Sequence, residues 1–279
     1  MKIAIAGAGI GGLVLALMLH KRGIEAEVFE SVETIRALGV GINLLPHASR
    51  ELAELGLLPT LSEIGIQTSQ LAYYNVFGQE IWREPRGLAA GYEWPQFSIH
   101  RGALQMALLR AAGEHIGNER IHLGHAFEGF EQDDQGVTLK LRRRSDNALA
   151  EARADVLVGA DGIHSAVRRC LHPVGDAPRF SGRMLWRAIT EGEPFGDGRS
   201  MFMAGHQDQK FVCYPISEPL RQQGRSLLNW IAELRVPEGA REKADWNRKV
   251  DKSAFASRFS GWKWDWIDIP AVINGAGAI

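Results

Sequence analysis

The sequence predicts an α/β fold that contains two kinds of sheet, one parallel and one antiparallel. Residues 3–31 alternate strand, glycine-rich turn, helix and second strand, which is typical of a parallel layer. Residues 120–158 and 176–279 instead contain short strand-like runs separated by turns, as in antiparallel sheets. The 279 residues, 45% of them hydrophobic, can bury a substantial core in one large or two modest domains.

The N-terminal layer carries a G-x-G-x-x-G motif at Gly7, Gly9 and Gly12. Residues 3–6 form the predicted first strand, Gly7 allows a tight turn, Gly9 leaves room for a pyrophosphate, and Gly12 lets a helix over 13–21 pack on the strand. The N-terminal N–H groups and positive dipole end of such a helix attract phosphate. The motif therefore predicts a dinucleotide site.

Glu30 strengthens this interpretation. It follows Gly12 by 18 residues, at the end of a second strand predicted over 26–29. A carboxylate in that place accepts hydrogen bonds from the hydroxyls of an adenosine ribose. A secretory signal is the competing interpretation of Lys2 and the apolar run after it, but a cleaved signal does not require the second strand and its acidic end.

Charge and cysteine content exclude several classes of protein. The formal net charge is −1, so there is no electrostatic reason to expect nucleic acid or a membrane surface as partner. The two cysteines, Cys170 and Cys213, lie far apart without C-x-x-C spacing, which predicts neither a metal site nor a disulfide framework. No later apolar run is long enough to span a bilayer, and the cytoplasm is the expected compartment.

Two further segments contain candidate ligand contacts. Arg36 precedes a Gly39-x-Gly41 loop, where the small residues either let backbone lie against a flat ligand or form a flexible connection to a helix over 46–55. Arg101 and Gln105 are four residues apart at the start of another predicted helix. They either point toward one ligand or are exposed to solvent.

A third candidate follows the buried strand predicted over 156–159. Asp161 and Gly162 occupy the turn after it, and Ser165 and Arg168 lie on the next helical turn. Asp161 is placed to bind the ribityl chain or the ribose of a cofactor, although a strand that ends in Asp-Gly is also common in loops.

The chain resembles the group A flavoprotein monooxygenases, the p-hydroxybenzoate hydroxylase family. The match rests on the glycine motif with Glu30, on "HRGALQMAL" at 100–108, and on "VGADGIHSAVR" at 158–168. Three segments are most similar in sequence to the bacterial branch of salicylate, 3-hydroxybenzoate and phenazine hydroxylases. They are "RALGVGINLLPHA", "PQFSIHRGALQ" and "YPIS".

The resemblance implies a Rossmann-like FAD-binding (GR2-type) domain interleaved with an antiparallel-sheet substrate domain. It assigns residues 1–71 and 96–175 to the FAD-binding domain and residues 72–95 and 176–279 to the substrate domain. FAD is the implied cofactor, NAD(P)H a transient co-substrate that reduces it, and O₂ the source of the oxygen that enters a small aromatic substrate. A homodimer is compatible with the family.

The resemblance also predicts that the chain is C-terminally truncated. Family members continue with a strand, a Gly-Asp motif and a long helix, whereas this sequence ends at "WIDIPAVINGAGAI". Gly196-Asp197 comes too early to be that motif. We therefore expect an aromatic hydroxylase represented by most of its chain, or a non-catalytic or incompletely assembled FAD-binding fragment. A nicotinamide-dependent dehydrogenase is a weaker alternative, because no catalytic His/Asp or Tyr-x-x-x-Lys arrangement follows the dinucleotide fold.

Residues 176–279 supply the predicted substrate side. Four strand-like runs form the expected antiparallel sheet, and His206 and Tyr214 are candidates for a base that deprotonates a phenol. Each is as readily a structural strand residue. The segment 244–269 is predicted to be helical, with Trp246, Phe255, Phe259 and Trp262 as apolar anchors of a core.

Overall fold

The computed structural model describes residues 1–175, 179–237 and 249–277, which fall into two compact units. Unit 1 consists of Met1–Leu38 and Gly102–Pro178, and unit 2 of Gly39–Arg101 and Arg179–Ile279. The domain bounds expected from the sequence stay a prediction. None of the helices in the described ranges is long and apolar enough to cross a membrane.

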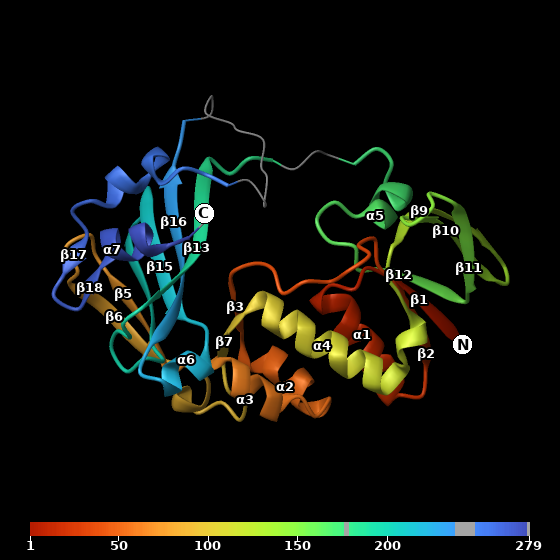
Figure 1. Ribbon diagram of the computed structural model, residues 1–279, viewed down its shortest axis with the longest axis horizontal. Coiled ribbons are helices and arrows are strands. Elements are labelled where there is room, and N and C mark those ends of the chain that lie inside the picture. The colour runs from red at the N-terminus through yellow and green to blue at the C-terminus, as the bar shows by residue number, and fades with distance from the viewer. Residues whose placement is uncertain (176–178, 238–248, 278–279) are drawn as a thin grey trace. The chain divides into compact units, whose positions relative to one another are not determined.

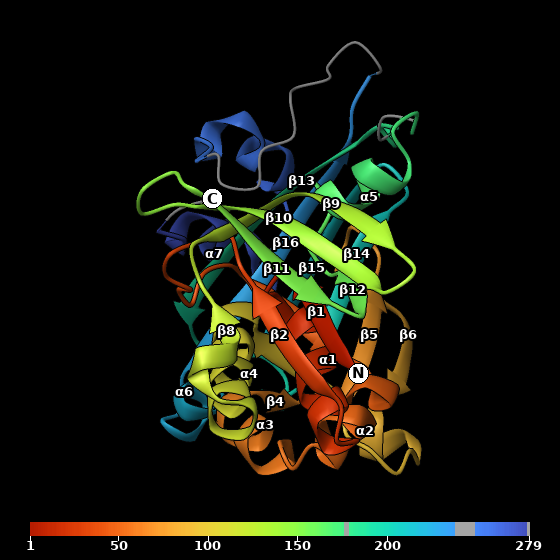
Figure 2. The same ribbon diagram turned by 90° about the vertical axis from the view of Figure 1, so that its right-hand side faces the viewer.

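Unit 1 is built on a four-stranded parallel sheet with the order β12-β1-β2-β8 (Figure 2). Its central strand reads Lys-Ile-Ala-Ile-Ala and is buried because strands pair on both of its edges. The strands are β12 (Val156–Gly159), β1 (Lys2–Ala6), β2 (Glu25–Phe29) and β8 (Ile121–His122). The helices are α1 (Ile10–Lys21), α4 (Arg101–Ile116), which enters this unit from Gly102, α5 (Ala166–Leu171) and the 3-10 turn η2 (Asn118–Arg120).

A three-stranded antiparallel sheet completes unit 1. Its order is β11-β10-β9, and its strands are β9 (His125–Asp133), β10 (Gly136–Arg143) and β11 (Leu149–Ala154). Leu139 and Leu141 of β10 point to the same side and are buried against Phe29 and Ala4 of the parallel sheet. The alternating pattern in the sequence therefore predicted these strands correctly, because every second residue is apolar.

Unit 2 is built on a six-stranded sheet with the order β13-β16-β15-β14-β5-β6, antiparallel except between β14 and β5. We call it the large sheet. Its strands are β13 (Arg183–Gly192), β16 (Ser226–Arg235), β15 (Gln209–Pro215), β14 (Met201–His206), β5 (Gln70–Tyr74) and β6 (Glu80–Pro85). Phe77 and Gly78 lie in the hairpin turn that connects β5 to β6.

The other elements of unit 2 are short. A small antiparallel sheet pairs β3 (Gly41–Leu44), β7 (Phe97–His100) and β4 (Ile66–Gln67), and a hairpin pairs β17 (Lys263–Trp264) with β18 (Ile267–Asp268). The helices are α2 (Pro46–Glu54), α3 (Leu58–Ile64), α6 (Glu218–Gln222) and α7 (Ile269–Gly275), with 3-10 turns η1 (Gly87–Ala90), η4 (Lys252–Ala254) and η5 (Ala256–Phe259).

The two faces of the large sheet differ. The first face carries an aromatic core in which Phe211 and Trp230 pack against Phe255 and Phe259 from the C-terminal segment (Figure 1, blue). The second face carries a smaller apolar cluster of buried and partly buried side chains from five strands. Its members are Leu71, Tyr73, Ile189, Met201, Met203, Val212, Tyr214, Ile216 and Leu227.

The predicted helix over 244–269 is wrong for the residues that the structure describes. Residues 252–259 form two 3-10 turns, and Trp264 and Ile267 belong to a hairpin. Phe255 and Phe259 are spaced as on a helix, but successive 3-10 turns also bring both to the core, and the alternation Trp262, Trp264, Trp266 has the period of a strand. The core role of Phe255, Phe259 and Trp262 is confirmed, whereas Trp246 lies outside the described residues.

Candidate functional site

The glycine loop joins β1 to α1 and is held by close backbone contacts. A Cβ on Gly12 would lie 2.0 Å from the carbonyl oxygen of Gly7, so only glycine lets α1 pack on the turn. Gly7 has a φ of +106°, and a Cβ there would lie 2.5 Å from the carbonyl oxygen of Ala160. The turn is therefore fixed against the loop that follows β12.

Gly9 and Gly11 have the opposite surroundings. A Cβ on either residue would meet no atom within 4 Å. Gly9 is the N-cap of α1, yet no side chain caps the helix and its first turn carries no acidic residue. The first N–H groups and the positive end of the helix dipole therefore face open space, which suits a phosphate. This cradle fits the predicted dinucleotide, and α1 begins at Ile10, three residues before the predicted start.

Glu30 follows β2 and binds three groups near this loop. Its Oε2 accepts a hydrogen bond from the backbone N–H of Ala8 at 2.8 Å. Its Oε1 accepts from the N–H of Val32 at 3.0 Å and from the hydroxyl of Ser31 at 2.9 Å. A carboxylate offers about four acceptor positions, so capacity remains for a ribose. The anchoring of Ala8 by Glu30 could not be read from the motif.

Gln105 supports the loop from the other side. It lies one turn into α4, and its Nε2 donates a hydrogen bond to the carbonyl oxygen of Ala8 at 3.0 Å. Gly102 brings α4 close to the preceding segment, because a Cβ there would lie 2.4 Å from the carbonyl carbon of Ala37. The sequence indicates Gln105 as a ligand contact but shows neither its hydrogen bond to Ala8 nor the close approach at Gly102. Direct binding of FAD by Gln105 stays a prediction.

Arg36 and Arg101 are both exposed. The N–H of Arg101 donates to the carbonyl oxygen of Val40 at 2.9 Å, and its side chain passes 3.8 Å from the Cβ position of Gly39. Arg101 therefore lies beside the Gly39 loop, and both belong to the segment Gly39–Arg101 of unit 2. Contact of either arginine with a cofactor stays a prediction.

Asp161 lies in the loop after β12, as predicted. Its Oδ2 accepts from the N–H groups of Ala166 and Val167 at 2.6 and 3.2 Å, at the start of α5. Its Oδ1 is buried and accepts no hydrogen bond from the residues that the structure describes. An unsatisfied buried carboxylate oxygen costs on the order of 1–3 kcal/mol, and a hydroxyl donor from a bound ligand would remove that cost. Gly162 beside it has a φ of +75° and open space at its Cβ position.

Gly41 has a structural contact inside unit 2. A Cβ there would lie 2.8 Å from Asn229 Cβ and from Ile216 Cγ2, and its N–H donates to Asn229 Oδ1 at 2.7 Å. The close approach that the sequence indicated therefore brings β3 against the large sheet. A further contact of Gly41 with a flat ligand stays a prediction.

His206 and Tyr214 have different surroundings. His206 is an exposed residue at the β14–β15 turn, where its Nδ1 accepts from the N–H of Asp208 at 3.2 Å. Tyr214 is buried on the second face of the large sheet. Burial raises the pKa of Tyr214 to about 12, and the positive charge of Arg187 opposes that rise. The structure does not bring the two candidates together, and their role as a base stays a prediction.

The comparisons with known proteins agree with this geometry. Residues 1–259 match the family described as "FAD binding domain". The chain belongs to this family. The predicted FAD cofactor and the predicted α/β fold class are therefore confirmed.

Named relatives indicate which kind of FAD-binding protein this chain is similar to. Over 98% of its length the chain is 41% identical to a phenazine 1,6-dicarboxylic acid hydroxylase of Lysobacter antibioticus and covers 68% of that protein. Over 94% of its length it is 32% identical to the aurachin C monooxygenase/isomerase of Stigmatella aurantiaca and covers 63% of it. The chain thus spans roughly two thirds of the length of these curated relatives. The predicted resemblance to group A hydroxylases is confirmed.

A solved structure shares the fold. The chain superposes over its full length on Klebsiella pneumoniae HpxO, determined with FAD and uric acid, with a TM-score of 0.75 and 23% identity, and covers 67% of that chain.

Proposed function

We propose that the protein is an FAD-dependent monooxygenase that uses NAD(P)H and O₂ to hydroxylate an aromatic substrate. The observation that carries the proposal is the 41% identity to a phenazine dicarboxylic acid hydroxylase, which extends over 98% of this chain. The open cradle at Gly9 and Gly11 and the unsatisfied oxygen of Asp161 support it, because each matches a polar part of a dinucleotide.

Residues of unit 1 would hold FAD. The N–H groups at the start of α1 would bind the pyrophosphate, Glu30 the adenosine ribose, and Oδ1 of Asp161 a hydroxyl of the ribityl chain. When bound and reduced by NAD(P)H, the flavin supplies the activation of O₂ and the transfer of one oxygen atom. Gln105 and Glu30 together fix both backbone groups of Ala8, so the loop is ordered before the cofactor binds.

We infer that the substrate is a flat aromatic acid and that the second face of the large sheet receives it. Met203 and Val212 provide partly buried apolar surface there, and Tyr214 is buried beside them. Arg187 lies two residues before Ile189 on β13 and so faces the same side, where its charge acts on Tyr214. A guanidinium is suited to a carboxylate, and the relative from Lysobacter antibioticus is named for a dicarboxylic acid.

Tyr214 is placed to orient this substrate. Because its pKa is raised to about 12, its hydroxyl keeps its proton at neutral pH and can donate a hydrogen bond. This favours a donor role over the role of a base. A cytoplasmic location and a homodimer remain expectations from the sequence.

The test measures flavin content, NAD(P)H oxidation and product. The purified protein should show the visible absorbance bands of bound flavin, which a nicotinamide dehydrogenase lacks. NAD(P)H oxidation should accelerate when an aromatic acid such as phenazine-1-carboxylate is added, and ¹⁸O₂ should label the hydroxylated product. Bound flavin together with NAD(P)H oxidation at the same rate with and without every aromatic acid tested would contradict the hydroxylase and favour a non-catalytic flavoprotein.

Arg187→Met tests the substrate surface. It should raise KM for an aromatic carboxylate by roughly tenfold or more, since a charge-assisted hydrogen bond contributes about 1.5–3 kcal/mol, while FAD affinity stays unchanged. The uncharged carboxamide of the same ring system is the matched control, because its KM should change little. Equal losses for the acid and the amide would place the carboxylate elsewhere.

A further inference from the structure

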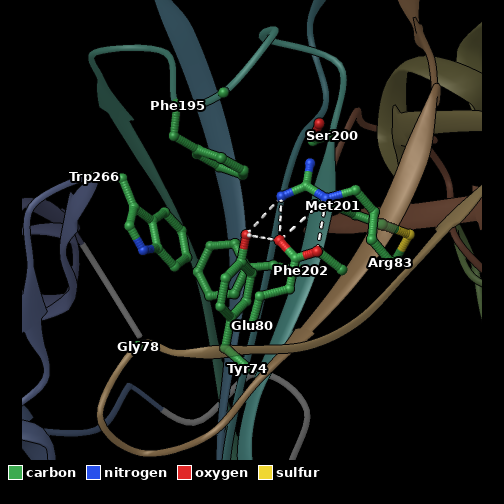
Figure 3. Close-up of a pocket in the computed structure, with 11 residues that line it drawn as sticks. Tyr74, Gly78, Glu80, Arg83, Phe195, Ser200, Met201, Phe202 and Trp266 are labelled. Carbon is green, nitrogen blue, oxygen red and sulfur yellow. Dashed lines mark hydrogen bonds and ion pairs between the residues drawn. The ribbon is translucent and has the colours of Figure 1, made fainter.

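A cavity of about 380 Å³ lies at one edge of the large sheet and is formed wholly by unit 2. Figure 3 shows it between the β5–β6 hairpin, the loop before β14 and the β17–β18 turn. Its volume is at the small end of the range of about 300–1,000 Å³ that is usual for small-molecule sites. It shares no residue with the nucleotide loop, so binding there does not depend on the proposed activity.

Aromatic rings form one wall of the cavity. The rings of Tyr74 and Trp266 have centroids 4.5 Å apart, and Phe202 meets Trp266 edge to face at 5.0 Å. Phe195 packs edge to face on Phe202 at 5.2 Å. In Figure 3 the rings of Phe195, Trp266 and Tyr74 stand around the same space. Such rings offer both faces and edges to a flat aromatic guest.

The opposite wall is polar. Nη2 of Arg83 donates to Glu80 Oε2 at 2.6 Å and to the hydroxyl of Tyr74 at 3.0 Å, and Nε donates to the same carboxylate. Nη1 of Arg83 donates to no atom in the described part of the chain. Figure 3 shows this nitrogen on the side of the guanidinium that faces Ser200. One fixed donor therefore remains for a ligand.

The walls are held in place before any ligand binds. Asp197 accepts from the hydroxyls of Ser69 and Ser200 at 2.6 Å each, which fixes the loop that carries Phe195. Trp264 covers Gly78 of the hairpin turn, where a Cβ would lie 2.3 Å from its ring, and its own ring lies 5.3 Å from that of Trp266. A preformed site loses little side-chain freedom on binding.

Charge decides the class of ligand. Glu80 and Arg83 form an ion pair whose opposite charges largely cancel, so neither a carboxylate nor an ammonium ligand gains a net attraction that would offset the loss of its hydration. Asp197 already accepts from two hydroxyls and from the N–H of Arg199. The remaining interactions are ring stacking and one hydrogen bond from a donor.

We propose that this cavity binds an uncharged planar aromatic molecule that carries a hydrogen-bond acceptor. The ring stacks among Phe195, Trp266 and Tyr74, and the acceptor binds Nη1 of Arg83. The site lies on the first-face side of the large sheet, as Tyr74 and Phe202 pack with the first-face core, whereas Tyr214 belongs to the second face. It is therefore a second small-molecule site, with a preference for charge different from that of the proposed substrate surface.

Three naphthalene probes of similar size test the charge preference by titration calorimetry. They are naphthalene-2-carboxamide, naphthalene-2-carboxylate and (2-naphthylmethyl)ammonium. In the Arg187→Met variant, which lacks the guanidinium of the proposed substrate surface, the carboxamide should bind with one-to-one stoichiometry and at least tenfold more tightly than either charged probe. No measurable binding of the carboxamide, or tighter binding of a charged probe to this variant, overturns the proposal.

Variants locate the bound probe. Arg83→Met should weaken carboxamide binding at least tenfold, and Trp266→Leu should weaken it by several-fold through lost stacking. Arg142→Met is the matched control, because Arg142 also forms a two-nitrogen ion pair with a carboxylate, Glu128, in unit 1. Arg187→Met should leave carboxamide affinity unchanged.

Two results of the variants count against the proposal. Unchanged affinity in Arg83→Met and Trp266→Leu, with circular dichroism like that of the parent, places the probe elsewhere. Loss of affinity in Arg187→Met with none in Arg83→Met assigns it to the second face of the sheet. If Arg83→Met does not fold, Tyr74→Phe, which removes only the hydroxyl that orients Arg83, decides in its place by the same criterion.

Discussion

Two glycine loops of this protein have similar sequences and different surroundings. Gly7-x-Gly9 in unit 1 and Gly39-x-Gly41 in unit 2 both precede a helix or strand that the backbone must approach closely. At Gly9 the space where a Cβ would stand is empty, whereas at Gly41 it is filled by Asn229 and Ile216. A glycine in a loop thus reports a close approach, and only the structure says whether another part of the chain already occupies the space.

Gly12→Ala should have the largest effect on this comparison. The new methyl would lie 2.0 Å from the carbonyl oxygen of Gly7, a backbone atom that moves only with the whole turn. We expect a loss of about 3 kcal/mol in the free energy of unfolding, at the upper end of the range for overpacking. Urea unfolding followed by circular dichroism measures it.

Gly11→Ala is the control for that variant. Its Cβ meets nothing within 4 Å, and alanine favours a helix over glycine by about 1 kcal/mol. Stability without cofactor should therefore stay equal or rise. If both variants lost the same stability, the contact between Gly12 and Gly7 would not be the cause.

Glu30→Ala tests the ligand side of the first loop. Loss of a charged acceptor should weaken FAD binding by about 1.5–3 kcal/mol, which flavin fluorescence titration detects as a rise in Kd of more than tenfold. Glu33→Ala removes an exposed carboxylate three residues further on and should leave Kd unchanged. An unchanged Kd in Glu30→Ala would remove this residue from the site.

Gly41→Ala tests the second loop. The methyl would meet Cβ of Asn229 at 2.8 Å, and we expect a loss of about 2 kcal/mol in stability from overpacking. Asn229→Gly removes the opposing side chain and also the acceptor for the N–H of Gly41. In a double-mutant cycle, Gly41→Ala should therefore cost less in the Asn229→Gly background than in the parent. Strict additivity of the two changes would show that the contact is not the source of the loss.

Tyr214, which lies opposite Asn229 in the pairing of β15 with β16, gives the smallest effect, a dependence of stability on pH. The folded-state pKa of about 12 lies above the ordinary value of 10.0, so the neutral hydroxyl is favoured in the folded state. This contribution is complete below pH 10 and is lost as pH rises through 12, amounting to a loss of about 1.4 kcal/mol at pH 11. Tyr214→Phe should remove that part of the decline in urea unfolding between pH 9 and pH 11, and the exposed Tyr92→Phe should not. Equal declines in Tyr214→Phe and the parent would contradict it.

Much of the fold and part of the site could be predicted from local patterns. Gly7, Gly12 and Glu30 lie within one strand–helix–strand unit, so their spacing along the chain largely fixes their positions in space. Alternation in β10 likewise revealed a half-buried strand. The segment after residue 249 was predicted wrongly, because its aromatic spacing fits a helix and also a series of turns around one core.

The sequence by itself determined the family, the α/β fold and the glycine-rich turn between β1 and α1, since each depends on neighbours along the chain and on backbone conformations that favour glycine. Only the tertiary structure decided that Gln105 binds Ala8, that Asn229 fills the space beside Gly41, and that Phe195 and Trp266 meet Tyr74 around a cavity. These contacts join residues far apart in the sequence: Gln105 and Ala8 are separated by 97 positions, and Gly41 and Asn229 by 188. Strand pairing and side-chain packing bring such residues together, and neither a local hydrophobic pattern nor a short motif predicts these contacts.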